Sequence, residues 1–349
     1  MDDLEILEVE GTSEGGERIT FSYFGITPGL KYIQPFVQNK LITENSVVIK
    51  RSTIPLSELE NTYTACQSDL IIVAVDKDTV SSLATPEAFI MPFRIHQIVN
   101  TLSGWDVVKK SMSKREVKRS IKQKEQYNLD YHVTYKDEDF FHFYDTIHKP
   151  TMDVRFGELA RSVERNEAFT QLFKKGLLFV VTHNGIPISG SVSQIDKEKN
   201  WLNARLIGVL EGDSKYREMG GQNHVYHSIL HWACNEGKIN VVDFQGCEPF
   251  LTKGTFQYKK RFGTSAILPP NDFYNKRLLV KANFNLKAVR DFFINNPVML
   301  INEKDELGAG YFYDIDIQPR LDIPYACPGF EYHKLINVNN ICEEQLVCI

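Results

Sequence analysis

The segment 177–209 carries the strongest constraint on how this chain can fold. Two runs rich in aliphatic residues flank the dipeptide Asn184-Gly185, and Asn-Gly between two such runs is the strongest short-range signal for a β-hairpin. A polar turn at 196–200 then leads into a third apolar run. We therefore expect three consecutive antiparallel strands, at 177–183, 188–195 and 201–209.

Two helices are expected upstream of these strands. Aromatic residues recur through 138–148 in the pattern of an amphipathic helix. This helix should stop at Lys149-Pro150, because the residue before a proline is disfavoured in helical geometry. A second helix is expected at 157–174.

A glycine-rich, charged loop at 211–221 follows the third strand. The apolar residues of 222–235 then recur at the spacing of a helix with one buried face, and Gly237 is a typical residue to end it. A short strand is expected at 241–244. The residues that share the buried face are Val225, Ile229, Trp232 and Ala233.

The chain should contain about two domains, given its 349 residues. Runs rich in Val and Ile at 46–51 and 70–75 predict buried strands, and a short helix is expected at 56–64 between them. This alternation predicts an α/β unit. The expected organisation is an N-terminal α/β half at 1–108, a second domain at 109–270, and a C-terminal extension at 271–349 that either covers the active site or completes the sheet.

Composition excludes several classes of protein. The 40 basic and 45 acidic residues give a net charge of -5, and 42% of residues are hydrophobic, which excludes a disordered, collagenous or coiled-coil chain. No apolar run approaches the ~18 residues of a membrane-spanning helix. The acidic start of the sequence lacks the features of a signal peptide, so we expect a cytoplasmic protein. Six scattered cysteines predict free thiols; a zinc site formed by Cys327, Cys342, Cys348 and His333 is the alternative.

The segment 109–124 is strongly basic, with Glu116 as its one acidic residue. A helix here would carry its cations on one continuous face. The segment is either a solvated helix that joins two domains or a surface that binds phosphates, in a nucleotide-linked substrate or in RNA. The residues of this face are Lys114, Arg115, Lys118, Arg119 and Lys122.

The loop before the helix at 222–235 reads Arg217-Glu-Met-Gly220-Gly221-Gln222. Its glycines allow the backbone to approach a ligand closely, and the amides at a helix N-terminus attract anions. Together with the three strands, the helix and the following strand, this loop resembles the acyl-CoA core of the GNAT N-acyltransferases. The resemblance implies that the loop amides hold a pyrophosphate. Gln222 stands where that pattern has Gly or Ala.

The following segment resembles the GNAT branch of Fem-type peptidoglycan aminoacyltransferases and related polysaccharide-cluster acyltransferases. It reads Asp243-Phe-Gln-Gly246-Cys-Glu-Pro249, then Gly254, then Tyr258-Lys259-Lys260-Arg261-Phe262-Gly263. The basic segment and an Arg155-Phe-Gly motif extend the resemblance over 105–270. It implies two GNAT-like halves built from mixed, mostly antiparallel sheets flanked by helices, an α/β (α+β) fold with the catalytic half at 109–270.

The resemblance also implies roles for individual residues. Arg155 and Lys259 would bind phosphate or stabilise the negative charge that develops on a carbonyl oxygen during acyl transfer. An amine nucleophile must lose a proton, so a carboxylate is expected nearby, and Asp243 and Glu248 are the first candidates. Capping of the following turn is the alternative role of Asp243. The expected binding residues are Arg155, Arg217, Gly220, Gly221, Gln222, Tyr258, Lys260 and Arg261.

The expected reaction moves an acyl or aminoacyl group to an amine of a small or nucleotide-linked acceptor. Acyl-CoA is slightly favoured as the donor over aminoacyl-tRNA, and both are substrates rather than tightly bound cofactors. No membrane span is expected, and a tRNA is a possible partner. A non-catalytic GNAT-like module that binds nucleic acid or an anionic partner through its basic helix is the alternative.

Three histidines suggest a competing site. His224, His227 and His231 fall on one face of the helix at 222–235, where they could bind a metal or could form a polar helix face. No accompanying carboxylate spacing favours the metal, so none is expected. The sequence also lacks a Gly-x-Ser-x-Gly elbow and a phosphate loop that ends in Gly-Lys-Ser/Thr, which argues against a hydrolase and a kinase.

Overall fold

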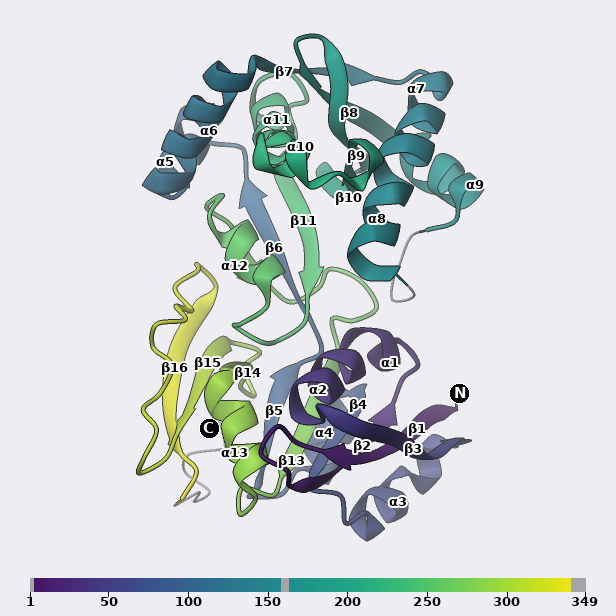
Figure 1. Cartoon of the computed structure of the whole chain (residues 1–349), viewed down its shortest axis with the longest axis vertical. Coiled ribbons are helices and arrows are strands. Elements are labelled where there is room, and N and C mark those ends of the chain that lie inside the picture. The colour runs from purple at the N-terminus through teal and green to yellow at the C-terminus, as the bar shows by residue number, and fades with distance from the viewer. Residues whose placement is uncertain (1–2, 158–162, 340–349) are drawn as a thin grey trace. The chain divides into compact units, whose positions relative to one another are not determined.

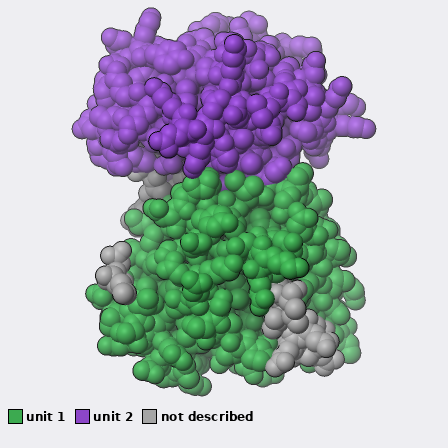
Figure 2. Space-filling model, turned by 180° about the vertical axis from the view of Figure 1, so that it is seen from behind, with its two compact units in different colours: residues 1–95, 246–257, 266–349 green, residues 96–245, 258–265 purple. Residues whose placement is uncertain are grey.

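The computed structural model describes residues 3–157 and 163–339 (Figure 1). It is a mixed α/β structure with three sheets, mostly antiparallel and flanked by helices, as the sequence predicts. The chain divides into two compact units, which are coloured separately in Figure 2. Unit 1 contains residues 1–95, 246–257 and 266–349, and unit 2 contains residues 96–245 and 258–265.

Unit 1 is built on a six-stranded sheet in the order β3-β1-β2-β4-β13-β5. Helices cover it, and a three-stranded sheet, β14-β15-β16, follows near the C-terminus. The strands are β1 (Leu4–Thr12), β2 (Arg18–Gly25), β3 (Glu44–Ile54), β4 (Leu70–Asp76), β5 (Ala88–Pro92), β13 (Lys276–Ala282), β14 (Val298–Ile301), β15 (Leu307–Tyr313) and β16 (Phe330–Asn337). The helices are α1 (Pro28–Tyr32), α2 (Gln34–Leu41), α3 (Leu59–Ala65), α4 (Lys77–Leu83) and α13 (Lys287–Asn295).

The C-terminal segment completes the first sheet. β13 lies between β4 and β5 and pairs antiparallel with both. Its central residues, Leu278 to Val280, are almost fully buried. The predicted boundaries at 108 and 270 therefore differ from the compact units, because pairing between strands distant in the sequence assigns 266–349 to unit 1.

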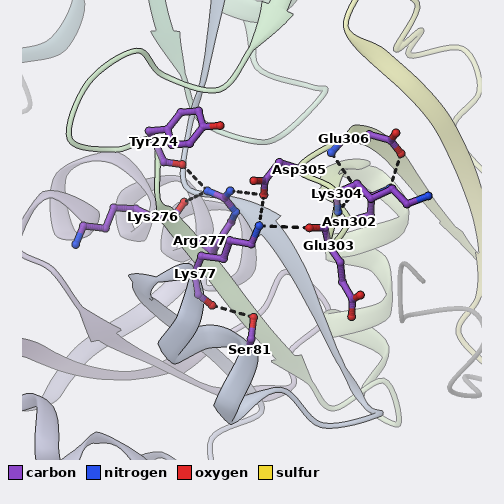
Figure 3. Close-up of polar contacts among 10 residues, drawn as sticks. All are labelled: Lys77, Ser81, Tyr274, Lys276, Arg277, Asn302, Glu303, Lys304, Asp305 and Glu306. Carbon is purple, nitrogen blue, oxygen red and sulfur yellow. Dashed lines mark hydrogen bonds and ion pairs between the residues drawn. The ribbon is translucent and has the colours of Figure 1, made fainter.

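An ion triad joins this segment to α4 (Figure 3). Oδ1 of Asp305 lies 2.8 Å from Nη2 of Arg277 and 2.8 Å from Nζ of Lys77. The Arg277 side chain is only 2% exposed, and its guanidinium also donates to the carbonyl oxygens of Tyr274 and Lys276. A buried guanidinium requires such partners, since an unpaired charge in the interior is costly.

Two predictions for the N-terminal half are confirmed and one is wrong. The strand at 70–75 is β4 and is buried, and the helix at 56–64 corresponds to a 3₁₀ turn at Leu56–Glu58 followed by α3. The strand at 46–51 is part of β3, but it is exposed rather than buried. β3 is an edge strand that pairs with β1 alone among the described strands, and Val47, Val48 and Ile49 are each more than half exposed, so no other described element covers them.

Unit 2 contains most of a seven-stranded sheet in the order β12-β6-β11-β10-β9-β8-β7, although two residues of β12 and the last two of β11 are assigned to unit 1. The hairpin prediction is confirmed: β8 pairs antiparallel with β9, and Asn184 and Gly185 both have positive φ, 50° and 82°, as a type I′ turn requires. The strands are β6 (Ile95–Asn100), β7 (Leu129–Thr134), β8 (Gly176–His183), β9 (Ile186–Asp196), β10 (Trp201–Val209), β11 (Val241–Cys247) and β12 (Ser265–Ile267).

Helices cover both faces of the unit 2 sheet. Leu177, Phe179 and Val181 of β8 pack in one apolar cluster with α11 (Gly221–Asn235). Leu178 and Val180 point the other way and pack in a second cluster with the aromatic helices upstream, because side chains alternate along a strand. The remaining helices of unit 2 are α5 (Trp105–Ser111), α6 (Lys114–Tyr127), α7 (Asp137–His142), α8 (Lys149–Phe156), α9 (Arg165–Glu167) and α10 (Ser214–Glu218), and unit 2 also contains the last residues, from Tyr258, of α12 (Gly254–Lys260).

The predicted helix end at Lys149-Pro150 is wrong. α7 continues through a π-helical turn at Phe143–His148 directly into α8. Pro150 stands where the π-helical turn passes into α8, a place where the regular hydrogen-bond ladder of an α-helix is already interrupted. Of the helix predicted at 157–174, residues 158–162 lie outside the described residues, and 165–173 are helical.

Candidate functional site

Two parallel strands of unit 2 begin side by side and then continue beyond their shared pairing. Trp201–Asn203 of β10 pairs with Val241–Asp243 of β11, and both strands run on for several residues. β10 leads through a loop into α11, which returns to the start of β11. The N-terminus of α11 therefore lies at the same end of the sheet as the last residues of these two strands.

The glycine turn before α11 adjoins the basic helix. Gly220 has φ +93°, a conformation that glycine adopts at little cost. A Cβ atom at this position would collide with the Gln123 side chain of α6. Nε2 of Gln123 also donates to the carbonyl oxygen of Glu218 at 3.2 Å. The two segments that the sequence predicts to bind phosphate are thus in contact.

The other predicted residues of this loop support its backbone. Arg217 donates through Nη1 to the carbonyl oxygen of Gly212 at 3.2 Å. Gly221 begins α11, and a Cβ atom there would lie 2.9 Å from the carbonyl oxygen of Tyr216. Gln222 is partly exposed in the first turn of α11. The first amides of a helix have no intrahelical acceptor, so this end of α11 favours an anion.

The cationic helix is confirmed as α6. It begins after Ser113, whose hydroxyl accepts from the amide of Glu116 at 3.2 Å. Lys114, Lys118 and Lys122 are exposed, as the predicted face requires. Glu116 itself is only 2% exposed and points into unit 2, which the sequence pattern does not indicate.

Glu116 is the centre of a buried polar network. Its Oε1 accepts from the side-chain amide of Asn223 and lies 3.2 Å from Nε2 of His227. Asn223 in turn accepts from the hydroxyl of Tyr258 at 3.2 Å. Burial opposes ionisation of Glu116, but the hydrogen bonds from His227 and Asn223 outweigh it and lower the pKa of the carboxyl. The network connects α6, α11 and α12.

A second polar chain surrounds Asp243. Its Oδ2 lies 2.7 Å from Nδ1 of His96, and its Oδ1 accepts from the amide of Gln245 at 2.6 Å. Gln245 has φ +66°, and its carbonyl oxygen accepts from Nζ of Lys259 at 2.9 Å. The structure thus brings Asp243 and Lys259 together through Gln245. His96 was not among the predicted site residues, and no local motif marks it.

Lys259 to Arg261 form the end of α12 and the turn after it. Lys259 is 6% exposed, whereas Lys260 is half-buried and Arg261 is exposed. The carbonyl oxygen of Arg261 accepts from the amide of Ser113 at 2.9 Å. This bond ties the α12 segment to the start of the basic helix.

The two remaining predicted residues are Arg155 and Glu248. Arg155 is exposed in the last turn of α8. Its charge acts on Tyr226 of α11: burial raises the pKa of Tyr226 to about 12, and Arg155 acts in the opposite direction. The Tyr226 ring in turn contacts the Tyr258 ring, at a centroid distance of 5.3 Å. Glu248 belongs to unit 1, where it is 7% exposed and lies 3.3 Å from Nζ of Lys253.

The three histidines of α11 share one face but do not form a metal centre. His227 contacts Glu116, and Nδ1 of His231 lies 2.7 Å from the hydroxyl of Tyr131. Within residues 3–157 and 163–339, no group of three or more His, Cys, Asp or Glu side chains is arranged to hold a metal ion. Cys342 and Cys348 of the alternative zinc site lie outside the described residues. Cys327 is a thiol.

These arrangements have the components of a group-transfer site that handles anions. A helix N-terminus and a cationic helix face can bind phosphates, and the side chain of Lys259 is held at the end of a strand. The Asp243–His96 pair can hold and move a proton, since the carboxylate fixes the orientation of the imidazole. No helix in the described parts of the chain is long and apolar enough to cross a bilayer.

No protein-family model matches the sequence, and no curated protein matches it either. Three solved structures that overlap it are FemX, at 13% identity over 81% of this chain and 90% of that chain with a TM-score of 0.42; L-PGS from Bacillus licheniformis, at 8% over 78% and 83% with a TM-score of 0.38; and a GCN5-related N-acetyltransferase from Kribbella flavida, at 10% over 60% and 66% with a TM-score of 0.30. Similarities at this level do not identify an activity.

Proposed function

We propose that this chain is a GNAT-like acyltransferase that moves an acyl or aminoacyl group from an activated donor to an amine. The observation that carries the proposal is the contact of Gln123 with the Gly220 turn. Arg119, whose Nε lies 3.4 Å from Oε1 of Gln123, brings one edge of the cationic face of α6 next to the N-terminus of α11. A donor with a phosphate-bearing handle, and not a neutral ester, suits such a surface.

In this proposal, different residues of unit 2 stabilise the oxyanion and transfer the proton. The amine nitrogen attacks the donor carbonyl carbon, the carbonyl oxygen becomes negatively charged, and the carbon–sulfur or carbon–oxygen bond to the leaving group then breaks. Lys259 stabilises the oxyanion. The His96–Asp243 pair accepts the proton that the amine loses and returns it to the departing thiolate or alkoxide, so that no charge accumulates.

The donor is proposed to be an acyl-CoA or an aminoacyl-tRNA, with the acyl-CoA slightly favoured, and the acceptor a small or nucleotide-linked amine in the cytoplasm. Both donors carry several phosphates and either would use the α6 face. Gln222 in the first turn of α11 occupies space that a glycine or alanine would leave to a pyrophosphate. This departure from the coenzyme A loop pattern keeps aminoacyl-tRNA among the proposed donors. We accordingly include membership of the Fem-type branch in the proposal.

The test measures donor binding and turnover separately. Purified protein is titrated with acetyl-CoA and with a mixture of aminoacyl-tRNAs, and its thermal stability is recorded, since a ligand that binds only the native state raises the melting temperature. Amine acceptors are then supplied and the released thiol or deacylated tRNA is measured. We expect stabilisation by one donor class and turnover with at least one amine.

Two variants distinguish an enzyme from a binding module. Lys259→Ala should lower turnover by about 100-fold, the usual effect of losing one oxyanion donor, while donor binding persists. Charge reversal at Lys114, Lys118 and Lys122 together should weaken donor binding and reduce its salt dependence. Circular dichroism of each variant verifies that it folds. If neither donor class stabilises the protein, or if turnover is absent and only nucleic acid binds, the acyltransferase proposal is wrong.

A further inference from the structure

Unit 2 contains a pocket of about 260 Å³ between the basic helix and the histidine face of α11. His224, His227 and His231 line it from α11. The opposite walls come from α5, α6 and the neighbouring strand β7. The pocket lies entirely within unit 2, and neither Gly220 nor Lys259 lines it.

His224 has an unsatisfied polar atom in this pocket. The residue is 7% exposed, and its Nε2 has no hydrogen-bond partner among residues 3–157 and 163–339. Buried polar atoms in native proteins are nearly always paired, and leaving one unpaired is costly. Burial, with the nearby charges of His227 and Lys124, lowers the pKa of His224 to about 4. The imidazole is therefore neutral near pH 7; in the tautomer that carries its proton on Nε2, and with the ring turned toward the pocket, it can donate one hydrogen bond to a bound oxygen atom.

The other two histidines are already engaged. His227 contacts the carboxylate of Glu116, and His231 contacts the hydroxyl of Tyr131. A metal ion would have to replace both contacts, and within residues 3–157 and 163–339 no group of three or more His, Cys, Asp or Glu side chains is arranged to hold one. His224 thus provides a hydrogen-bonding atom for an organic ligand and not one member of a metal centre.

The charge and polarity of the walls define the ligand class. Lys109 and Lys124 line the pocket, and none of its described lining residues is acidic. Trp105, Val117 and Ile121 supply an apolar surface. A complementary ligand has one negatively charged oxygen group and a compact apolar body. The volume corresponds to about nine water molecules at ~30 Å³ each, which suits a small organic acid better than a nucleotide.

We propose that this pocket binds a small carboxylic acid with an aromatic or branched apolar body. The carboxylate accepts a hydrogen bond from Nε2 of His224 and faces the ammonium group of Lys124. The apolar body packs on Trp105 and Ile121. This would be a second ligand site of the chain, and it does not depend on acyl transfer.

Benzoate is the probe for the test. Titration of the full chain with benzoate should change the tryptophan fluorescence and saturate with a Kd of about 1 mM or below, as expected of a compact ligand with few contacts. Trp105→Phe should remove most of the signal while calorimetry still detects binding. Benzamide, which has the same shape without the charge, should bind at least about ten-fold more weakly.

Matched variants test the two polar contacts. Lys124→Gln and His224→Phe should each weaken benzoate binding by about ten-fold or more. Lys122→Gln and His132→Gln change exposed residues outside the pocket and should leave the Kd within about two-fold. Unfolding midpoints verify that every variant is native. The proposal is overturned if benzoate does not bind, if benzamide or inorganic phosphate binds equally well, or if the Lys124 and Lys122 variants behave alike.

Discussion

Oδ2 of Asp243 lies 2.7 Å from Nδ1 of His96, and the two residues are 1% and 5% exposed. They are 147 positions apart in the sequence and meet because β6 and β11 are neighbours in the unit 2 sheet. Asp243 also fixes the left-handed backbone at Gln245, which accepts the hydrogen bond of Lys259. One carboxylate thus holds two groups that the proposed reaction needs.

Substitution of this carboxylate should reveal its coupling to His96. Asp243→Asn is expected to lower the free energy of unfolding by about 1–3 kcal/mol, because charged hydrogen bonds are replaced by neutral ones. His96→Gln should have a smaller effect in the Asp243→Asn background than in the wild type, with a coupling of at least about 0.5 kcal/mol by urea unfolding. Additive effects would contradict a functional pair, as would unchanged turnover in Asp243→Asn.

The glycine turn should not tolerate a side chain. Gly220→Ala is expected to cost about 1–2 kcal/mol, since an alanine is strained at φ +93°, while the Gln123 side chain that its Cβ would touch can move away. Gly254→Ala is the matched control, because a Cβ there meets no atom within 4 Å and its φ is not positive. Urea unfolding and donor-induced stabilisation measure the two effects. If Gly220→Ala and Gly254→Ala lose the same free energy of unfolding, the positive φ of Gly220 does not make this turn dependent on glycine.

The buried histidine of the pocket should make stability dependent on pH. The folded-state pKa of His224 is about 4, below the ordinary value of 6.5, so the unfolded chain takes up this proton first as the pH falls. Its contribution to stability is complete above about pH 6.5 and is lost as the pH falls toward 4, by about 3 kcal/mol.

His224→Gln cannot take up that proton, so its stability should decline less over the same range. His132→Gln, at an exposed position of β7, serves as the control and should follow the wild type. Urea unfolding at closely spaced pH values measures the difference. Parallel curves for wild type and His224→Gln would show that burial does not hold His224 neutral.

The ion triad of unit 1 should stabilise the C-terminal segment. Asp305→Asn leaves the buried Arg277 without its carboxylate and is expected to cost about 3 kcal/mol. Asp322→Asn breaks the exposed Arg320–Asp322 pair and should cost less than about 1 kcal/mol. Thermal and urea unfolding measure both. If Asp305→Asn lowers the free energy of unfolding no more than Asp322→Asn does, the triad does not help to hold β13 in place.

The same triad should weaken in acid. Burial opposes ionisation of Asp305, but hydrogen bonds from Lys77 and Arg277 outweigh it and lower its pKa. The contribution is therefore present above the ordinary pKa of an aspartate, about 3.9, and is lost as the pH falls through the lower folded-state value. The difference between wild type and Asp305→Asn should shrink over that range, and a constant difference would contradict this account.

Local patterns in the sequence determined the β8–β9–β10 meander, the cationic helix α6 and the buried face of α11. Each depends on residues within about one element: a dipeptide with positive φ, a four-residue repeat of cations, or an apolar period of 3.6. Neighbouring residues alone decide these structures, which is why the predictions agree with the structure there.

Contacts between distant segments decided the rest. The burial of Glu116, the exposure of β3 and the placement of β13 between β4 and β5 depend on which elements become neighbours. The contact of His96 with Asp243, and the lack of a partner for Nε2 of His224 among the described residues, also depend on which elements become neighbours. A sequence pattern specifies which face of an element is apolar, but the partner that covers the face, and so the environment of each polar group, exists only after the chain has folded.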